Sequence, residues 1–353
     1  MVRISDILKD EDLIRKGKGE IKGGRDKKMA ISEALTAEDI VGDKISPSLR
    51  APTNREKKDA LSLLEKFHEV LENVFSSIRE EKEFDIIPLE SLVEQFVNSL
   101  NKYENIYMMQ AYGDYDKTDL TYHSMWTALI SIKIGKKLEI EGKQLKELFL
   151  AGLLHDVGLL LIPEEILKKE RESFRSEMAE IKNHPEKGHM ILNKLGEQYH
   201  YLLEVSYQEH ERVDGSGYPQ GLKGNEIGLL SQIIGIADTY EAMTHNRPYR
   251  VRKLPLYVIK EIVETMKGKF NPKILKALLE AITLYPVGSF VRLNNKEVGR
   301  VIASMGGSHF RHVVQILYGP DGEKLFEPRT VNLMDAHLLY IVEPVDEREF
   351  GNK

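Results

Sequence analysis

The stretch Ala151-Gly-Leu-Leu-His-Asp-Val-Gly158 decides how this chain of 353 residues is interpreted. Within it, His155 and Asp156 interrupt a run that is otherwise apolar. Burying an imidazole and a carboxylate costs free energy unless the two groups are paired or bind a cation. The dipeptide alone is also compatible with a helix cap or with a paired group in the core, so the rest of the sequence has to separate these interpretations.

Working outward, the apolar pattern predicts three regions and a mainly α fold. Residues 116–285 show helical spacing of apolar residues, broken at several prolines and at the turn-forming run 214–219. Residues 1–115 are predicted to be an N-terminal helical and regulatory region, with apolar positions at helical spacing such as Leu64, Phe67 and Leu71. Residues 286–353 change to short β-rich runs at 289–293, 297–304, 312–318 and 338–342, which predict a small β-barrel-like module.

Composition limits the chemistry that is available to the chain. It has no cysteine, so disulfides and thiolate metal sites are excluded and a metal must be held by nitrogen and oxygen ligands. The formal net charge of -6 argues against a binder of long nucleic acids. Because no apolar run is long enough to span a bilayer and no signal peptide is evident, we expect a cytoplasmic protein without membrane insertion.

The helical middle of the chain holds a set of histidines and carboxylates on separate segments. Each has a structural explanation when it is taken alone, such as a helix cap or a polar helix face. Together they provide enough nitrogen and oxygen ligands for two adjacent cations. These candidate ligands are His123, His155, Asp156, His184, Glu209, His210 and Asp238.

At this point the sequence resembles a known family, the HD-GYP proteins of the HD superfamily, which are bacterial phosphodiesterases that hydrolyse cyclic di-GMP. The resemblance covers residues 119–284, close to half of the chain. The matching motifs, in order, are His155-Asp156-Val-Gly158, Lys182-Asn-His184-Pro185, His210-Glu211-Arg-Val-Asp214-Gly-Ser-Gly-Tyr218-Pro219, Ile236-Ala-Asp238 and Arg247-Pro248-Tyr249-Arg250.

The resemblance implies an all-helical domain with two or three divalent metal ions, of which iron or manganese are expected. It assigns His123, His155, Asp156 and Asp238 to one metal. Asp156 is expected to bridge to a second metal that His184, His210 and position 209 also hold. Asp119, one helical turn before His123, matches the position where some members keep a carboxylate for a third metal.

Two positions depart from the family pattern. Glu209 stands where the family usually has the first of two adjacent histidines. As a ligand, it would favour iron or manganese; if it turned away, the second metal would lack a ligand. Leu159 stands where the family has a lysine that approaches a substrate phosphate. Its loss removes one source of charge stabilisation in the transition state.

The implied reaction opens cyclic di-GMP to linear pGpG, with GMP as an alternative end product, through a hydroxide that bridges the metals. Asp156 is expected to be essential for catalysis. Arg247 and Arg250 are expected to hold substrate phosphates through forked hydrogen bonds, and Tyr218 borders the substrate. The loop around Tyr218 is also implicated in contacts with diguanylate cyclase domains, and a homodimer is compatible with this interpretation.

Two other functions remain open from the sequence. The departures at positions 159 and 209 also fit a protein without turnover that acts as a receptor for cyclic di-GMP or as a signalling scaffold. A different HD hydrolase, acting on mononucleotides or alarmones, is a further alternative, although those relatives lack the Gly-Tyr-Pro loop.

Overall fold

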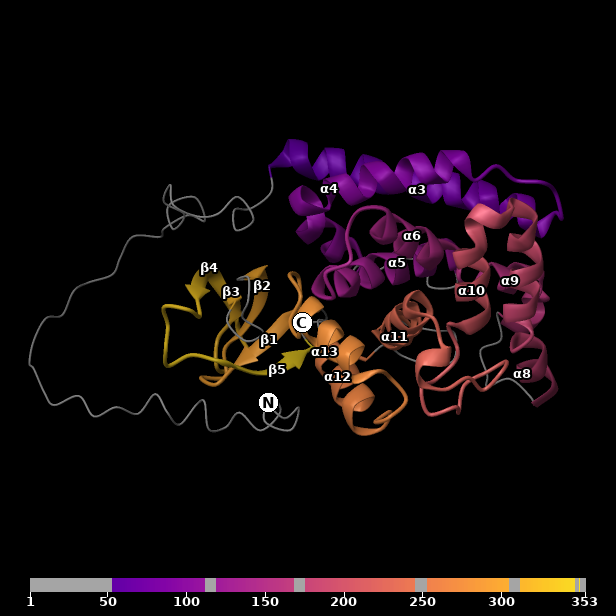
Figure 1. Cartoon of the computed structure of the whole chain (residues 1–353). Helices are drawn as coiled ribbons and strands as arrows, with labels where there is room; N and C mark the ends of the chain where they lie inside the picture. Colours follow the sequence, from indigo (N-terminus) through magenta and orange to yellow (C-terminus); the bar gives the residue numbers. More distant parts are fainter. Residues whose placement is uncertain are drawn as a thin grey trace, which may run out of the picture. The chain divides into compact units, whose positions relative to one another are not determined.

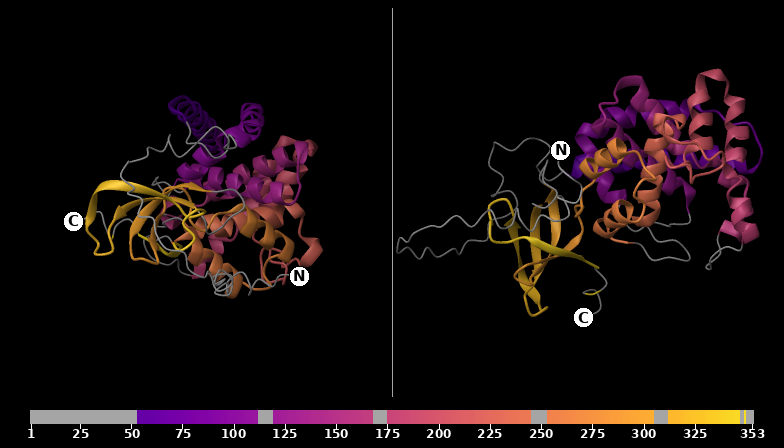
Figure 2. Two further views of the ribbon diagram at one scale, coloured as in Figure 1. Left: turned by 90° about the vertical axis from the view of Figure 1, so that its left-hand side faces the viewer. Right: turned by 60° about the horizontal axis from the view of Figure 1, so that its bottom comes forward.

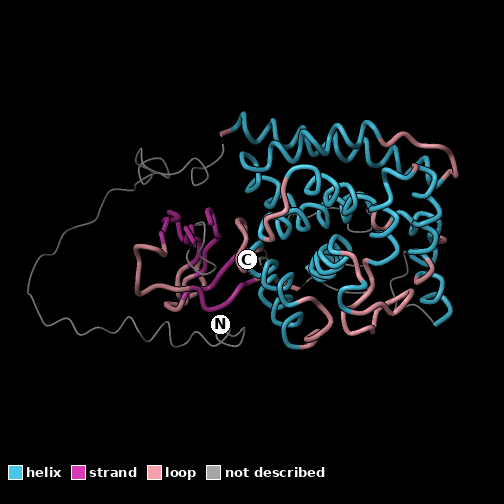
Figure 3. The backbone as a smooth tube through the Cα atoms, viewed as in Figure 1, coloured by secondary structure: helices cyan, strands magenta, loops and turns pink. Residues whose placement is uncertain are grey.

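The computed structural model describes residues 53–111, 119–167, 175–244, 253–304, 312–346 and 349. The described part up to residue 281 is helical, and the part from residue 290 is a sheet (Figures 1 and 3). The α-helices are α3 (Asn54–Arg79), α4 (Ile87–Ala111), α5 (Leu120–Lys137), α6 (Gly142–Leu154), α7 (Glu164–Leu167), α8 (Arg175–Ile181), α9 (His184–Leu192), α10 (His200–Gln208), α11 (Leu229–Thr244), α12 (Pro255–Glu264) and α13 (Pro272–Ala281).

Helix α3 begins at a complete capping box. The Thr53 hydroxyl accepts a hydrogen bond from the backbone N–H of Glu56, and the Glu56 carboxylate accepts one from the backbone N–H of Thr53. These bonds satisfy donors that a helix start otherwise leaves without a partner. The buried positions Leu64, Phe67 and Leu71 then follow one face of the helix, as their spacing predicts.

The helices share one hydrophobic core, to which α3 and α4 contribute as fully as the later helices. Phe67 of α3 and Phe96 of α4 both pack against Phe149 of α6, with ring centroids 5.7 Å and 4.8 Å from its ring. The boundary predicted between residues 115 and 116 falls in a segment outside the described residues. Within the described part, the two N-terminal helices are therefore packed into the same core as the helices that carry the candidate ligands.

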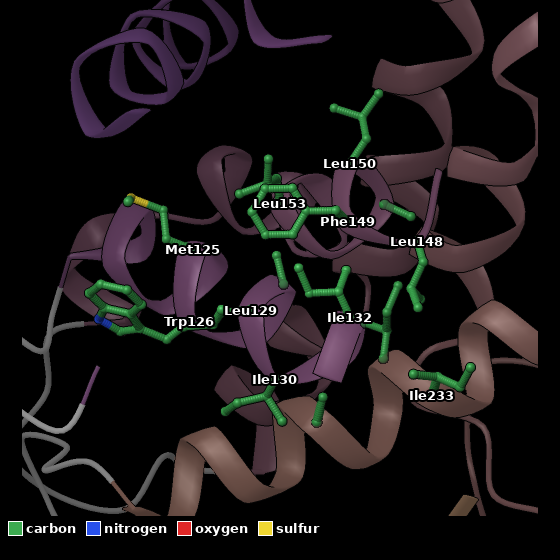
Figure 4. Close-up of a cluster of buried hydrophobic side chains, with 14 of the residues drawn as sticks. Met125, Trp126, Leu129, Ile130, Ile132, Leu148, Phe149, Leu150, Leu153 and Ile233 are labelled. Carbon is green, nitrogen blue, oxygen red and sulfur yellow. The ribbon is translucent and has the colours of Figure 1, made fainter. Parts of the chain in front are cut away.

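Helix α5 lies at the centre of this core and is buried around most of its circumference. Its apolar side chains, such as Leu129 and Ile132, meet Leu148 and Leu153 of α6 and Ile233 of α11 (Figure 4). A helix that is buried on all sides holds its polar side chains in fixed places, because neighbouring helices leave them little room. His123 on this helix is such a side chain, and only 3% of it is exposed.

The C-terminal part is one five-stranded antiparallel sheet with the order β4-β3-β2-β1-β5. The sheet is the orange and yellow part drawn with arrows in Figure 2. Its strands are β1 (Phe290–Leu293), β2 (Val298–Ser304), β3 (His312–Tyr318), β4 (Lys324–Asn332) and β5 (Ile341–Val345). A small core of its own, including Val291, Val301 and Val314, fills one face. The predicted C-terminal β module is present as an antiparallel sheet, but within the described residues the sheet has two edges, β4 and β5, and does not close into the predicted barrel-like form.

Sequence patterns located β1, β2 and β3 closely, but β4 was missed and β5 begins three residues after the predicted start. Strand β4 contains Pro328 and is exposed along most of its length, so it lacks the alternating apolar pattern of a half-buried strand. A proline has no N–H to donate and is tolerated at a sheet edge, which is where β4 lies. Elsewhere the mainly α prediction agrees with the helical fold of the described residues.

Among the described helices, none is long and apolar enough to cross a membrane.

Candidate metal centre

The seven candidate ligands come from five segments of the helical part, and the fold brings them together. His123 lies on α5, His155 and Asp156 directly follow α6, His184 is the first residue of α9, Glu209 and His210 directly follow α10, and Asp238 lies on α11. Their side-chain ligand atoms form two groups, within each of which all atoms lie within 4.8 Å of one another. One group is His123, His155 and Asp238, and the other is Asp156, His184, Glu209 and His210.

Asp156 lies between the two groups, and each of its carboxylate oxygens faces one of them. Oδ2 lies 3.4 Å from Nε2 of His123, and Oδ1 lies 3.2 Å from Nε2 of His184. The side chain is 8% exposed, so water screens these contacts little. A carboxylate with one oxygen on each group is suited to bridge two cations, which is the role expected for Asp156.

Three of the histidine rings are fixed by their Nδ1 atoms, and all three turn Nε2 toward the carboxylates. Nδ1 of His155 lies 2.8 Å from the carbonyl oxygen of Gly152, and Nδ1 of His184 lies 2.7 Å from that of Ile181. A carbonyl oxygen only accepts, so both Nδ1 atoms carry a proton, and Nε2 is the atom of each ring that can bind a cation through a lone pair. This is the usual state of a metal-bound histidine.

The third ring is held by a carboxylate that the sequence interpretation did not assign a role. Nδ1 of His123 lies 2.5 Å from Oε2 of Glu241, a residue that is 1% exposed on α11. Its Nε2 atom then faces Oδ1 of Asp238 at 3.3 Å. Glu241 follows Asp238 by three residues, so the helical repeat places both carboxylates on the same side of α11. That spacing was the available signal for its role.

The second group crowds three side chains around one ring nitrogen. Nε2 of His184 lies 3.1 Å from Nε2 of His210 and 3.4 Å from Oε1 of Glu209. Nδ1 of His210 lies 3.1 Å from Oε2 of Glu209. Glu209 is completely buried and faces both rings, so the structure brings it into the ligand group.

The pKa values show how strongly these groups act on one another. Burial alone would lower the pKa of His184, but the adjacent carboxylates of Asp156 and Glu209 outweigh it and raise the pKa to about 10. Burial and the positive charge of His184 together lower the pKa of His210 to about 4. Burial raises the pKa of Glu209 to about 7, although the hydrogen bond with His184 opposes this change. Without a metal, protons on these groups thus neutralise part of the negative charge of the buried carboxylates. A divalent cation would neutralise the same charge.

Several buried ligand atoms have no hydrogen-bond partner of good geometry, which tests the fit of the site to a metal. They include Nε2 of His155, Oδ1 of Asp156 and Oε2 of Glu209. Leaving such atoms without a bond costs about 1–3 kcal/mol each, and more for charged groups. Buried nitrogen and oxygen atoms that converge in this way fit divalent cations, and the absence of cysteine excludes thiolate ligation.

Glycines allow the ligand-bearing segments to approach closely. A Cβ atom on Gly158 would lie 1.9 Å from the carbonyl oxygen of His184, and one on Gly235 would lie 2.3 Å from that of Glu209. Both distances are far below van der Waals contact. Gly158 therefore lets the η2 segment (Val157–Leu161) lie against the start of α9, and Gly235 lets α11 lie against the end of α10.

The loop after His210 is organised by Glu211, whose role the sequence interpretation also missed. The carboxylate of Glu211 is buried and accepts hydrogen bonds from the backbone N–H groups of Gln220, Gly221 and Leu222, at 2.7–3.0 Å. The loop thereby folds back over the end of α10, and Tyr218 stacks on His210 with ring centroids 4.7 Å apart. The Tyr218–Pro219 peptide is cis.

Arg212 ties the same loop to its surroundings. Its guanidinium group donates to the carbonyl oxygens of Glu209 and Glu211, at 3.0 and 2.8 Å, and lies over the ring of Phe270. It also donates to the hydroxyl of Thr239 on α11, the residue after Asp238. Arg212 thus connects the backbone that carries Glu209 with the helix that carries Asp238.

Three further residues that were predicted to bind a metal or the substrate lie outside the two ligand groups or outside the described residues. Asp119 lies outside both ligand groups, and its carboxylate accepts from the backbone N–H of Thr121 at 2.8 Å and contacts Nε2 of His68 at 3.0 Å. Its role toward a third metal stays a prediction. Arg247 and Arg250 lie outside the described residues, so their predicted phosphate contacts also stay predictions.

Comparison with known proteins agrees with this fold. The profile of the HD domain family matches residues 101–274, and that of a KOW domain associated with HD domains matches residues 290–353. A cyclic di-GMP phosphodiesterase of Pseudomonas aeruginosa is 27% identical over 80% of this chain and 68% of its own. A 3'3'-cGAMP-specific phosphodiesterase of Vibrio cholerae is 41% identical over 38% of this chain and 31% of its own.

A further relative and a solved structure are also similar to this chain. A cyclic di-GMP phosphodiesterase of Thermotoga maritima is 30% identical over 54% of this chain and 53% of its own. Most of these matches thus span about half or less of the relative's length. A solved HD-GYP-type protein of Bdellovibrio bacteriovorus has the same fold, with a TM-score of 0.54 and 17% identity over 66% of this chain and 74% of its own. The chain belongs to the HD-domain family, and its curated relatives include proteins named as cyclic di-GMP phosphodiesterases.

Proposed function

We propose that this protein is a metal-dependent phosphodiesterase that hydrolyses cyclic di-GMP to linear pGpG. The observation that carries the proposal is the position of Asp156, with one carboxylate oxygen on each of two groups of buried ligands. Two bound divalent cations would supply a nucleophile at neutral pH and neutralise charge on the phosphate. Relatives named as cyclic di-GMP phosphodiesterases support the substrate.

The protein's own residues prepare this centre before substrate arrives. Glu241 and two backbone carbonyls fix the histidine rings, so little rotation is needed when a cation binds. Glu209 brings a buried carboxylate to the second group, where the family usually has a histidine. An oxygen ligand makes that group harder, so we propose that iron or manganese binds there in preference to softer metals.

A second cyclic dinucleotide is the main competing substrate. A relative that is 41% identical over 135 residues is named as specific for 3'3'-cGAMP. The two substrates share their phosphodiester ring and differ in one base, so the metal centre would act on either. The choice between them depends on residues that contact the bases.

The proposal also includes a cytoplasmic location, which rests on the sequence pattern alone. Three further features rest on the resemblance: a homodimer, contacts of the loop around Tyr218 with diguanylate cyclase domains, and substrate contacts by Arg247 and Arg250. GMP is an alternative end product if pGpG is cleaved further.

The test is a turnover assay on anaerobically purified protein supplied with iron or manganese. Cyclic di-GMP, 3'3'-cGAMP and pGpG are incubated separately, and chromatography identifies the products. We expect cyclic di-GMP to be converted to pGpG faster than 3'3'-cGAMP is opened, and Asp156→Ala to be inactive. Binding of cyclic di-GMP without cleavage over hours would favour the receptor function, to which the changes at Leu159 and Glu209 point. Preferred cleavage of 3'3'-cGAMP would reassign the substrate.

A further inference from the structure

Exposure of the ligands shows from which side the metal centre is open. The side chains of His155 and Glu209 are completely buried, and those of His184 and His123 are 2% and 4% exposed. His210 is 17% exposed, the most of the seven ligands. Asp238 follows at 13%, so the ligand centre is most accessible to a substrate phosphate beside His210 and Asp238.

Tyr218 borders this opening. Its ring is half-buried, stacks on His210 at an interplanar angle of 23°, and meets His184 edge-on at 6.5 Å between centroids. The ring itself carries no charge at neutral pH. Its faces instead attract cations.

Lys182 supplies a cation at this ring. Its ammonium nitrogen lies 5.0 Å from the centroid of the Tyr218 ring. Lys182 precedes His184 by two residues, so the start of α9 fixes where its backbone lies. The side chain is exposed, and it forms no ion pair with the carboxylates of the described residues.

Two other cations near the ligand segments are already committed to structural contacts. Lys187 donates to the Glu180 carboxylate at 2.6 Å and to the carbonyl oxygen of Leu161. Arg212 is held by the carbonyl oxygens of Glu209 and Glu211. Compared with these two, Lys182 keeps its charge available for an incoming anion.

We propose that Lys182 contacts a substrate phosphate and supplies the positive charge that the family places at position 159, where this chain has Leu159. The proposal rests on the proposed function, since it assumes a cyclic dinucleotide at the metal centre. An ammonium beside a phosphate forms charge-assisted hydrogen bonds and stabilises the negative charge that builds during cleavage. The Tyr218 ring holds the side chain near the opening and so limits the freedom it would lose on binding.

The experiment measures binding and turnover for Lys182→Met, Lys182→Arg and the control Lys194→Met. Lys194 is another exposed lysine of the same region, in the η3 turn (Asn193–Leu195), and its substitution makes the same change in net charge. Binding is measured by calorimetry with metal-loaded protein and a phosphorothioate analogue of cyclic di-GMP, which is cleaved slowly. We expect Lys182→Met to weaken binding by roughly 10-fold, Lys182→Arg by about 3-fold or less, and Lys194→Met to change nothing.

A double substitution tests whether a lysine at position 159 can replace Lys182 as the positive charge beside the substrate phosphate. If Lys182 replaces the missing lysine, Leu159→Lys should restore most of the binding and turnover lost in Lys182→Met. Equal affinities of Lys182→Met and Lys194→Met would overturn the proposal while leaving the proposed function intact. If the unaltered protein neither binds the analogue nor cleaves cyclic di-GMP, the proposed function itself fails. The two failures are therefore distinguishable.

Discussion

Glu241 holds His123 by a hydrogen bond of 2.5 Å between its Oε2 atom and Nδ1 of the ring. Both side chains are almost completely buried, and the two residues, on α11 and α5, are 118 positions apart in sequence. The bond turns Nε2 of His123 toward Asp156 and Asp238. A carboxylate in this position fixes the ring and makes the ligand nitrogen more basic.

We predict that Glu241→Gln weakens metal binding at the group of His123 by about 10–100-fold. The amide oxygen still accepts the hydrogen bond, so the ring keeps its orientation while the negative charge behind it is lost. Titration against a competing chelator measures the affinity, with Glu264→Gln at the exposed end of α12 as the control. If both variants retain the affinity of the unaltered protein, Glu241 has no part in metal binding.

Asp156→Ala should remove both metals together, because one carboxylate faces both ligand groups. Asp238→Ala, by contrast, removes a ligand from the group of His123 and His155 alone. We therefore expect this variant to lose the metal of that group and to keep the metal of the other group. Elemental analysis of the two variants after equal dialysis makes the comparison. Equal losses in the two variants would argue against a bridging role for Asp156.

Glu209→Gln should raise the stability of the metal-free protein and lower the stability of the metal-bound protein. In the metal-free protein, burial raises the pKa of Glu209 from 4.5 to about 7. Ionisation then costs stability above pH 4.5, where the unfolded chain has lost the proton, and the cost is complete above about pH 7. Removing the charge should therefore stabilise the metal-free variant above pH 7 by up to roughly 3 kcal/mol, with no difference below pH 4.5.

With metal bound, the same variant should be less stable than the unaltered protein, because a ligand carboxylate has been replaced. Thermal unfolding between pH 4 and pH 8, with metal and with chelator, tests both statements. A shift of the same sign in both conditions would mean that Glu209 is not a ligand.

Gly158→Ala should disrupt the contact between the η2 segment and α9, since the new methyl group would lie 1.9 Å from the His184 carbonyl oxygen. We expect the free energy of unfolding to fall by about 2–3 kcal/mol or more, and metal binding to weaken. Gly224→Ala is the control, because its φ of 52° adds backbone strain but no atom lies within 4 Å. Its cost should stay near 1 kcal/mol and leave metal affinity unchanged. Denaturant unfolding with and without metal measures both, and equal costs would show that the close approach at Gly158 is unimportant.

The candidate ligands could be selected from the sequence because the residue types that bind metals stand out in a helical, apolar context, and the fold brings seven of them together. His155 and Asp156 interrupt a buried run, and the motifs around His184, His210 and Asp238 keep the order of the family. From the sequence alone, Glu209 could either join the ligands or turn away from them. In the structure its carboxylate lies in the second group of candidate ligands. Sharing of Asp156 between the two groups followed from the resemblance and matches the observed distances.

Supporting residues were harder to predict because their roles depend on contacts across the fold. Glu241 acts on a ring that is distant in sequence, and Glu211 accepts from three backbone groups that follow it by nine to eleven residues. Lys182 gains its significance from the Tyr218 ring, which only the folded loop brings close. Strand β4 was missed because an exposed edge strand lacks an apolar pattern.

Metal content per chain, measured by elemental analysis on anaerobically purified protein, tests the central claim most directly. The two ligand groups that share Asp156 predict two divalent metal ions per chain, iron or manganese, in the unaltered protein. A content of one ion or none, after incubation with excess iron or manganese, would contradict the two-metal centre and with it the proposed phosphodiesterase.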